Sequence, residues 1–240
     1  MGTLLYRRRY MGGGFAEIDS QLVATFNVTS TSASTKLMYS TSILSKVDSL
    51  WIDGVKQPSV VAAYTFQTTG EHVVEYKLVD KTTIPEGMFR SCGELLSLTV
   101  QNGVLYSQTF ILYQSGLKTL VLSEGFLEYG NNSGAKPEGA LYFPDSLTSI
   151  GYMTFSDATA LTSVRIGPNI SFIAQYAFIR CSSLSSVTIE ATTPPTFGGN
   201  GVFNNTSANL KIYVPAESVE TYKAVPELVY VKTKIEAIPT

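Results

Sequence analysis

Apolar residues return at a fixed interval in the second half of this chain. From residue 150 to residue 189, each apolar position recurs 23 residues later. The matched positions are Ile150 and Ile173, Phe155 and Phe178, Leu161 and Leu184, Val164 and Val187, and Ile166 and Ile189. One repeat of this length cannot bury its apolar face alone, whereas stacked repeats share a continuous core. The spacing therefore predicts a solenoid of stacked repeats.

The same frame extends in both directions as pairs of apolar residues separated by one position. These pairs are Tyr76/Leu78, Leu98/Val100, Leu120/Leu122, Leu141/Phe143, Val164/Ile166, Val187/Ile189 and Leu210/Ile212. Alternate side chains of a strand point to opposite faces, so each pair predicts a short strand. A period in this range that ends in Leu-x-x-Val-x-Ile is typical of leucine-rich repeats. The predicted fold class is mainly β: a leucine-rich repeat solenoid of about seven short parallel strands, joined by short 3₁₀ or helical turns.

The clearest copy of the repeat reads Ile-x-x-x-Ala-Phe-x-x-Cys-x-x-Leu-x-x-Val-x-Ile from Ile173 to Ile189. This motif resembles the BspA-like leucine-rich repeat of bacterial surface proteins. A second copy matches at Ile84, Phe89, Cys92, Leu95, Leu98 and Val100. The resemblance covers roughly residues 73–238 and is poorest from Gly103 to Gly139, where the Ala-Phe-x-x-Cys signature is missing. It implies a surface-displayed binding or adhesion module with no catalytic residues.

The pattern divides the chain into four parts. They are an N-terminal arm at residues 1–20, a small β-rich capping domain at residues 21–72, the solenoid at residues 73–214 and a C-terminal cap at residues 215–240. In the capping domain, Asp53-Gly54 predicts a hairpin turn, and Trp51 is the expected centre of a small antiparallel core. An end repeat leaves an apolar face and an unpaired strand edge, so the solenoid needs a cap at each end.

The N-terminal arm carries three adjacent arginines, Arg7, Arg8 and Arg9, before a glycine run at residues 12–14. No apolar segment of the kind found in secretory signals follows them. Two interpretations remain open: a solvated arm, or a docking peptide that joins copies of the chain or a larger particle. Short basic starts of this kind are similar to those of phage tail and fibre proteins.

Composition argues against several functional classes. The chain has 17 basic and 19 acidic residues, which gives a net charge of −2. This balance does not favour binding of nucleic acid. No apolar run approaches the ~18 residues of a membrane span. His72 is the only histidine, and Cys92 and Cys181 lie about four repeats, ~19 Å, apart. The thiols are therefore expected to be free and buried. No metal, cofactor or catalytic site is predicted. The sequence leaves open a catalytic pair of carboxylates from distant parts of the chain, as in glycosidases.

The outward positions of the predicted strands are mostly small and polar. At the centre of this face, Val121, Tyr142 and Arg165 fall on consecutive strands, and aromatic and arginine side chains are frequent binding anchors. Residues 123–139 break the repeat with several glycines and form either an irregular binding loop, with Tyr129 and Asn131, or a degenerate repeat.

The expected function is non-enzymatic recognition or adhesion, with a protein or a glycan as the partner bound by the solenoid. The alternative is a structural or receptor-binding component of a phage or phage-like particle, docked through its arm. The expected location is accordingly the cell surface, the extracellular space or a virion.

Overall fold

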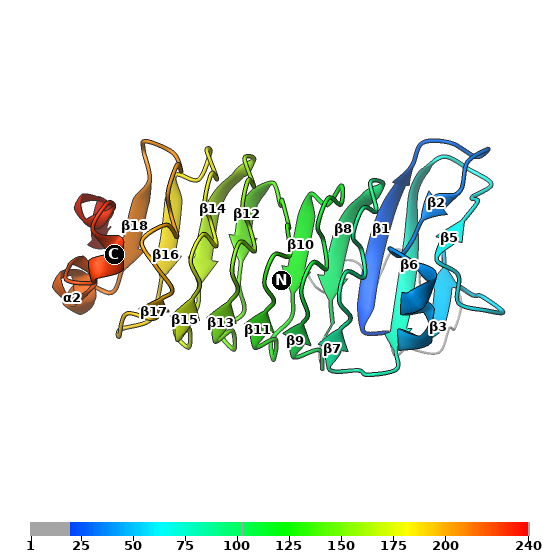
Figure 1. The fold of residues 1–240 in the computed structure, drawn as a ribbon, viewed down its shortest axis with the longest axis horizontal. Helices are drawn as coiled ribbons and strands as arrows, with labels where there is room; N and C mark the ends of the chain where they lie inside the picture. Colours follow the sequence, from blue (N-terminus) through cyan, green and yellow to red (C-terminus); the bar gives the residue numbers. More distant parts are fainter. Residues whose placement is uncertain (1–19, 102, 240) are drawn as a thin grey trace.

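Stacked turns of chain form an elongated coil, and an antiparallel sheet continues it at the N-terminal end (Figure 1). The computed structural model describes residues 20–101 and 103–239. The predicted arm, with Arg7–Arg9, lies outside the described residues apart from Ser20, so its docking role stays a prediction.

Six strands of the predicted frame stack in parallel along one face of the coil. They are β8 (Leu95–Val100), β10 (Thr119–Leu122), β12 (Gly139–Tyr142), β14 (Leu161–Ile166), β16 (Ser186–Ile189) and β18 (Lys211–Val214). Their inward side chains, such as Leu98, Val164 and Ile212, are at most 3% exposed. The predicted mainly β solenoid of short parallel strands is confirmed.

A second parallel sheet of two-residue strands runs along another side of the coil. Its members are β7 (Thr83–Ile84), β9 (Tyr106–Ser107), β11 (Glu128–Tyr129), β13 (Ser149–Ile150), β15 (Phe172–Ile173) and β17 (Thr196–Phe197). The second residue of each strand is buried, as at Ile150 and Ile173. These strands give the repeat a second apolar anchor beside the long strands.

Hydrogen-bonded turns close the third side of each repeat. The backbone N–H of Phe89 donates to Ile111 of the next turn at 2.8 Å, and Phe155 donates to Ala177 at 2.8 Å. The turns have a recurring backbone shape, since Met153 and Tyr176, one repeat apart, both have positive φ (53° and 63°). Helix is scarce among the described residues, as expected.

The interior of the coil holds a stack of aromatic rings. Phe155 and Phe178 lie parallel with centroids 5.4 Å apart and an interplanar angle of 8°. Phe203 continues the stack 5.8 Å from Phe178. The repeat register of the sequence therefore places Phe155 and Phe178 correctly, and all three rings are at most 4% exposed.

The N-terminal strands do not follow the predicted order. The first apolar pair, Tyr76 and Leu78, lies on β6 (Gly70–Leu78), but β1 (Leu22–Val28) separates this strand from β8. β1 runs antiparallel to both neighbours, with Leu22 opposite Tyr76 on one side and Val100 on the other. The expectation that β6 stacks directly on the next repeat is wrong, because an early strand is inserted between them (Figure 1).

The remaining elements of the N-terminal part are β2 (Thr35–Lys36), the 3₁₀ helix η1 (Thr41–Lys46), β3 (Val47–Ile52), β4 (Val55–Lys56) and β5 (Ala63–Tyr64). β3 and β4 form the predicted hairpin, and its turn at Asp53 and Gly54 has positive φ at both residues (49° and 79°). The expectation that Trp51 centres the core is wrong. Leu50 points inward there and is 1% exposed, while Trp51 lies half-buried on the other face beneath Lys56.

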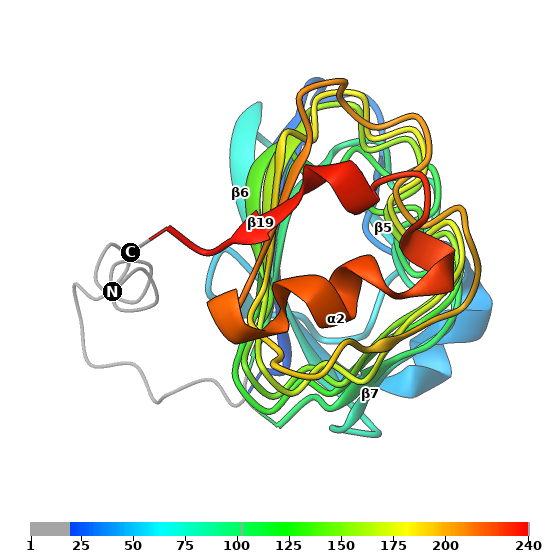
Figure 2. The same ribbon diagram turned by 90° about the vertical axis from the view of Figure 1, so that its left-hand side faces the viewer.

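The C-terminal end is closed by the 3₁₀ helices η2 (Ala216–Ser218), η3 (Pro226–Leu228) and η4 (Lys232–Lys234), the helix α2 (Val219–Lys223) and the strand β19 (Ile235–Ala237). Figure 2 shows α2 lying across the end of the coil. Its buried Tyr222 donates a hydrogen bond to the carbonyl oxygen of Ala191 at 2.8 Å. β19 pairs in parallel with β18 and forms the last edge of that sheet.

Residues 123–139 form a regular turn of the coil. β11 pairs with both β9 and β13, and Phe126 and Ala135 are fully buried. Of the two interpretations left open by the sequence, the degenerate repeat is therefore correct, and the irregular loop is wrong. Buried apolar residues at the right spacing replace the missing Ala-Phe-x-x-Cys signature.

The two thiols should react only when the chain unfolds. Both Cys92 and Cys181 are free and fully buried, as expected, and burial raises the pKa of each to about 12. Because the thiolate is the reactive form, a maleimide reagent at pH 7 should label neither residue in the native protein and both in denaturant. Mass spectrometry of the labelled chain measures this directly. Rapid labelling without denaturant would contradict the buried register.

Candidate binding surfaces

The three residues predicted at the centre of the strand face lie on consecutive strands, β10, β12 and β14. Tyr142 is 68% exposed and sits directly opposite Arg165 in the parallel ladder. Val121 on β10 is 41% exposed. The structure thus brings together two of the predicted residues as a cross-strand pair and places the third on the neighbouring strand.

No backbone ladder joins β10 to β12, so the face contains a seam between two sheets. The seam is spanned beside the strands by the N–H of Glu138, which donates to the carbonyl of Lys118 at 2.8 Å. The side chains of the same two residues form an exposed ion pair at 3.2 Å. Val121 and Tyr142 therefore flank the seam on its two sides.

Arg165 is held within the protein. Its Nη2 and Nε contact Glu190 at 2.5 and 2.9 Å, and its Nη1 contacts Asp145 at 2.6 Å and donates to the Phe143 carbonyl at 3.1 Å. Hydrogen bonding to Glu190, followed by that to Asp145, raises the pKa of Arg165. These contacts pair its charge with two carboxylates, so Arg165 supports the face beside Tyr142 and has little capacity for a partner.

Tyr129 and Asn131, the two binding residues predicted in residues 123–139, do not lie together on the surface. Tyr129 is 2% exposed and packs 5.3 Å from the ring of Phe155, so its prediction as a surface contact is wrong. Its position as the inward residue of β11 explains this burial. Asn131 is exposed, but its Oδ1 accepts a hydrogen bond from the N–H of Tyr152 at 2.6 Å and so serves the adjoining turn.

His72 forms hydrogen bonds that join two neighbouring segments of the chain. Its Nδ1 lies 2.7 Å from Oδ2 of Asp53, and its Nε2 lies 3.0 Å from the carbonyl oxygen of Thr68. The imidazole thereby connects the hairpin turn to the loop that precedes β6. Residues 20–101 and 103–239 contain no group of three His, Cys, Asp or Glu residues that could hold a metal ion. They also contain no helix that is long and apolar enough to cross a membrane.

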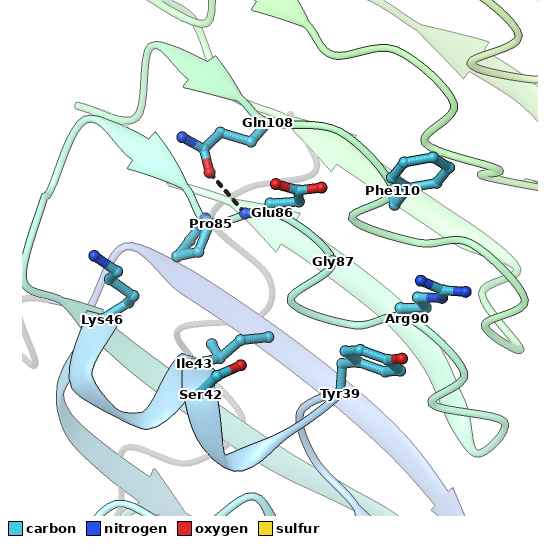
Figure 3. Close-up of a pocket in the computed structure, with 10 residues that line it drawn as sticks. All are labelled: Tyr39, Ser42, Ile43, Lys46, Pro85, Glu86, Gly87, Arg90, Gln108 and Phe110. Carbon is cyan, nitrogen blue, oxygen red and sulfur yellow. Dashed lines mark hydrogen bonds between the residues drawn. The ribbon is translucent and has the colours of Figure 1, made fainter.

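A second candidate surface is a hollow of about 380 Å³ between η1 and the turns of the first two repeats (Figure 3). It is lined by Tyr39, Ser42, Ile43, Lys46, Pro85, Glu86, Gly87, Arg90, Gln108 and Phe110. We call it the Arg90 pocket. Three segments that are distant in the sequence form it, which is why no single motif predicts it.

Comparison with known families now identifies the repeat. A model described as the BspA type leucine-rich repeat region matches residues 59–135 and 139–235 in six copies. The chain belongs to the BspA-type leucine-rich repeat family. The resemblance seen in the sequence is confirmed, and the match includes the poorly patterned stretch after residue 103. No curated protein matches the chain significantly.

Members of this family are repeat scaffolds that are generally non-enzymatic and typically surface-associated, and their repeats usually mediate protein interactions. The interruption of the family match at residues 136–138 falls immediately before β12. The long-strand ladder is interrupted between β10 and β12, beside Tyr142.

Proposed function

We propose that this chain is a non-enzymatic surface-recognition module that binds a protein partner through the strand face centred on Tyr142. The observation that carries the proposal is the exposure of Tyr142 on β12, where 68% of this large aromatic residue is accessible to solvent. Tyrosine is enriched in the cores of protein interfaces and among the residues that dominate binding energy.

The surroundings of Tyr142 support a protein interface. Val121 adds apolar surface across the seam, and small residues such as Ala140 and Ser163 leave the aromatic ring projecting. The nearest cation, Arg165, is neutralised by its two carboxylate partners. Interface cores are depleted of free charge and surrounded by polar residues, and this region has that distribution.

Replacing Tyr142 with serine should weaken partner binding by about 30-fold, which corresponds to a hot-spot loss of ~2 kcal/mol. The full chain and the Tyr142→Ser variant would be measured by surface plasmon resonance against purified extracellular-matrix and cell-surface proteins. The fold should be unaffected, because the side chain contributes little to the core.

Tyr230→Ser provides the matched control. Tyr230 is 71% exposed but lies in the C-terminal cap, far along the coil from β12 (Figure 1). Its loss should leave affinity unchanged. Equal effects of the two substitutions, or an unaltered affinity for Tyr142→Ser, would refute the proposed face.

The assignment to a phage or phage-like particle is a different candidate and rests on Arg7–Arg9, which lie outside the described residues. It stays a prediction. It is compatible with a recognition face, since a receptor-binding particle component would also present one.

A further inference from the structure

Arg90 differs from the other two arginines that the structure describes. Arg165 and Arg180 both form ion pairs, with Glu190 and Asp145 in the first case and with Asp157 in the second. In the described ranges, the guanidinium of Arg90 has no carboxylate partner, and its buried Nε has no hydrogen-bond partner. A buried donor left without an acceptor costs stability. Among the three arginines that the structure describes, Arg90 is therefore the one whose charge no carboxylate neutralises.

Aromatic rings hold the Arg90 guanidinium in place. It lies 5.0 Å from the ring centre of Tyr39, 5.8 Å from that of Phe110 and 5.5 Å from that of Tyr113. Figure 3 shows the guanidinium between the rings of Tyr39 and Phe110. Contacts of this kind restrict the motion of the charged group but occupy none of its five N–H donors. The buried Nε is closed to solvent, so it is the two terminal nitrogens that remain for an acceptor from outside the chain.

The rest of the Arg90 pocket is polar at its rim. Lys46 lies at the end away from Arg90 and, among the residues described, has no ion-pair partner (Figure 3). Glu86 supplies an exposed carboxylate between the two cations. Oε1 of Gln108 accepts the N–H of Glu86 at 2.8 Å, which leaves the amide NH₂ of Gln108 for another acceptor. Ser42 adds a hydroxyl group whose Oγ lies 2.6 Å from Oγ of Ser40, so one of these two hydroxyl groups donates to the other.

We propose that the Arg90 pocket binds a carboxylate-bearing sugar, a uronic acid residue of an acidic polysaccharide. A guanidinium forms paired hydrogen bonds with a carboxylate, so Arg90 holds the acidic group. Glu86, Gln108 and Ser42 provide the acceptors and donors that the hydroxyl groups of a sugar ring need. The site is distinct from the Tyr142 face and does not depend on the function proposed for that face.

The volume and charge of the pocket favour a sugar over an acidic peptide. A hollow of about 380 Å³ is at the lower end of small-ligand sites, which span ~300–1,000 Å³, and suits one or two sugar rings. Two cations and one carboxylate line it, a set that can bind an acidic group and hydroxyl groups side by side. A uronic acid residue combines one carboxylate with several hydroxyl donors, and those donors satisfy Glu86.

Isothermal titration calorimetry of the full chain with tetragalacturonate at low salt tests the proposal. Binding should be detected, and Arg90→Gln should weaken it by about 10- to 100-fold. Lys46→Gln, at an exposed position outside the core, should weaken it less and should leave the melting temperature unchanged. Added salt should weaken binding, because the attraction is partly between charges.

Three controls separate specific binding at Arg90 from a general attraction between charges. Arg180→Gln removes the same charge from a paired arginine and should keep full affinity. Methyl-esterified tetragalacturonate has the same backbone without the charge and should not bind. Tyr142→Ser should have no effect, so failure of the strand-face function would not be mistaken for failure of this one.

The proposal is overturned if tetragalacturonate does not bind, or if Arg90→Gln and Lys46→Gln both retain wild-type affinity. Binding of a tetraglutamate peptide in preference to tetragalacturonate would also overturn it and would assign the pocket to acidic peptides. If Arg90→Gln unfolds, Lys46→Gln and the methyl ester still decide the result, since neither disturbs the aromatic contacts of Arg90.

Discussion

Replacing Phe178 with alanine should lower the free energy of unfolding by about 3–5 kcal/mol. The ring is fully buried and stacks between Phe155 and Phe203, so its removal leaves a cavity that backbone-bonded turns on both sides cannot fill. Domains are stable by only ~5–15 kcal/mol, and this single loss is a large share of that total. Urea unfolding followed by circular dichroism measures the change.

Phe172→Ala is the matched control for this substitution. Phe172 lies on β15 at the start of the repeat that contains Phe178, faces outward and is 38% exposed. The substitution removes the same atoms from a position that faces solvent. It should lower the free energy of unfolding by well under half as much as Phe178→Ala does. If the two variants unfolded at the same urea concentration, the stack would not contribute as described.

The substitution Val23→Pro should lower the free energy of unfolding by about 3 kcal/mol or more and prevent stable folding of the N-terminal sheet. Val23 is opposite Glu75 on one neighbour and Thr99 on the other, so β1 is a central strand with ladders on both sides. Proline removes a ladder hydrogen bond there. The side chain itself is only half-buried, and the effect therefore reports on the backbone pairing. Thermal unfolding and native-state hydrogen exchange of β6 and β8 measure it.

Lys56→Pro tests the same change at an edge. β4 pairs with β3 alone, and both of its residues are exposed. We expect a loss of less than ~1 kcal/mol, because proline is tolerated on edge strands. A Val23→Pro protein as stable as Lys56→Pro would be inconsistent with β1 lying between β6 and β8.

The repeat can be predicted because each turn has nearly the same environment. Phe155 and Phe178 occupy the same depth of the coil, and so do Cys92 and Cys181, so an identical residue type satisfies the same packing need in each copy. The copy around Phe126 is hard to recognise, since its apolar residues satisfy that need without the signature sequence.

The insertion of β1 cannot be predicted by the same reasoning. Val23 and Ala24 read as an ordinary alternating strand, and no local feature specifies that their partners are two strands from distant parts of the chain. Size alone favours Trp51 as a core residue, whereas the strand register places its neighbour Leu50 there. Side-chain period fixes which residues share a face, but only tertiary pairing fixes which face is inside.

The two candidate binding surfaces also differ in how far the sequence predicts them. Tyr142 can be placed on the outer face because a strand alternates, and that placement needs no knowledge of neighbours. The Arg90 pocket joins Tyr39, Arg90 and Phe110 from three segments, and their proximity follows from how η1 packs against the turns. No spacing in the sequence encodes it.

The position of β1 also sets an order of events during synthesis. β1 leaves the ribosome long before β8, yet Leu22 must pair with Val100. At translation rates of ~5–20 residues per second, β1 waits on the order of 4–16 seconds for that partner. During this interval β6 is the only one of the two ladder partners of β1 that can be in place, so one edge of β1 stays unpaired. The later repeats can add one after another only once β8 has docked. The nascent chain is therefore most exposed to chaperones, and to aggregation, while its first hundred residues are being made.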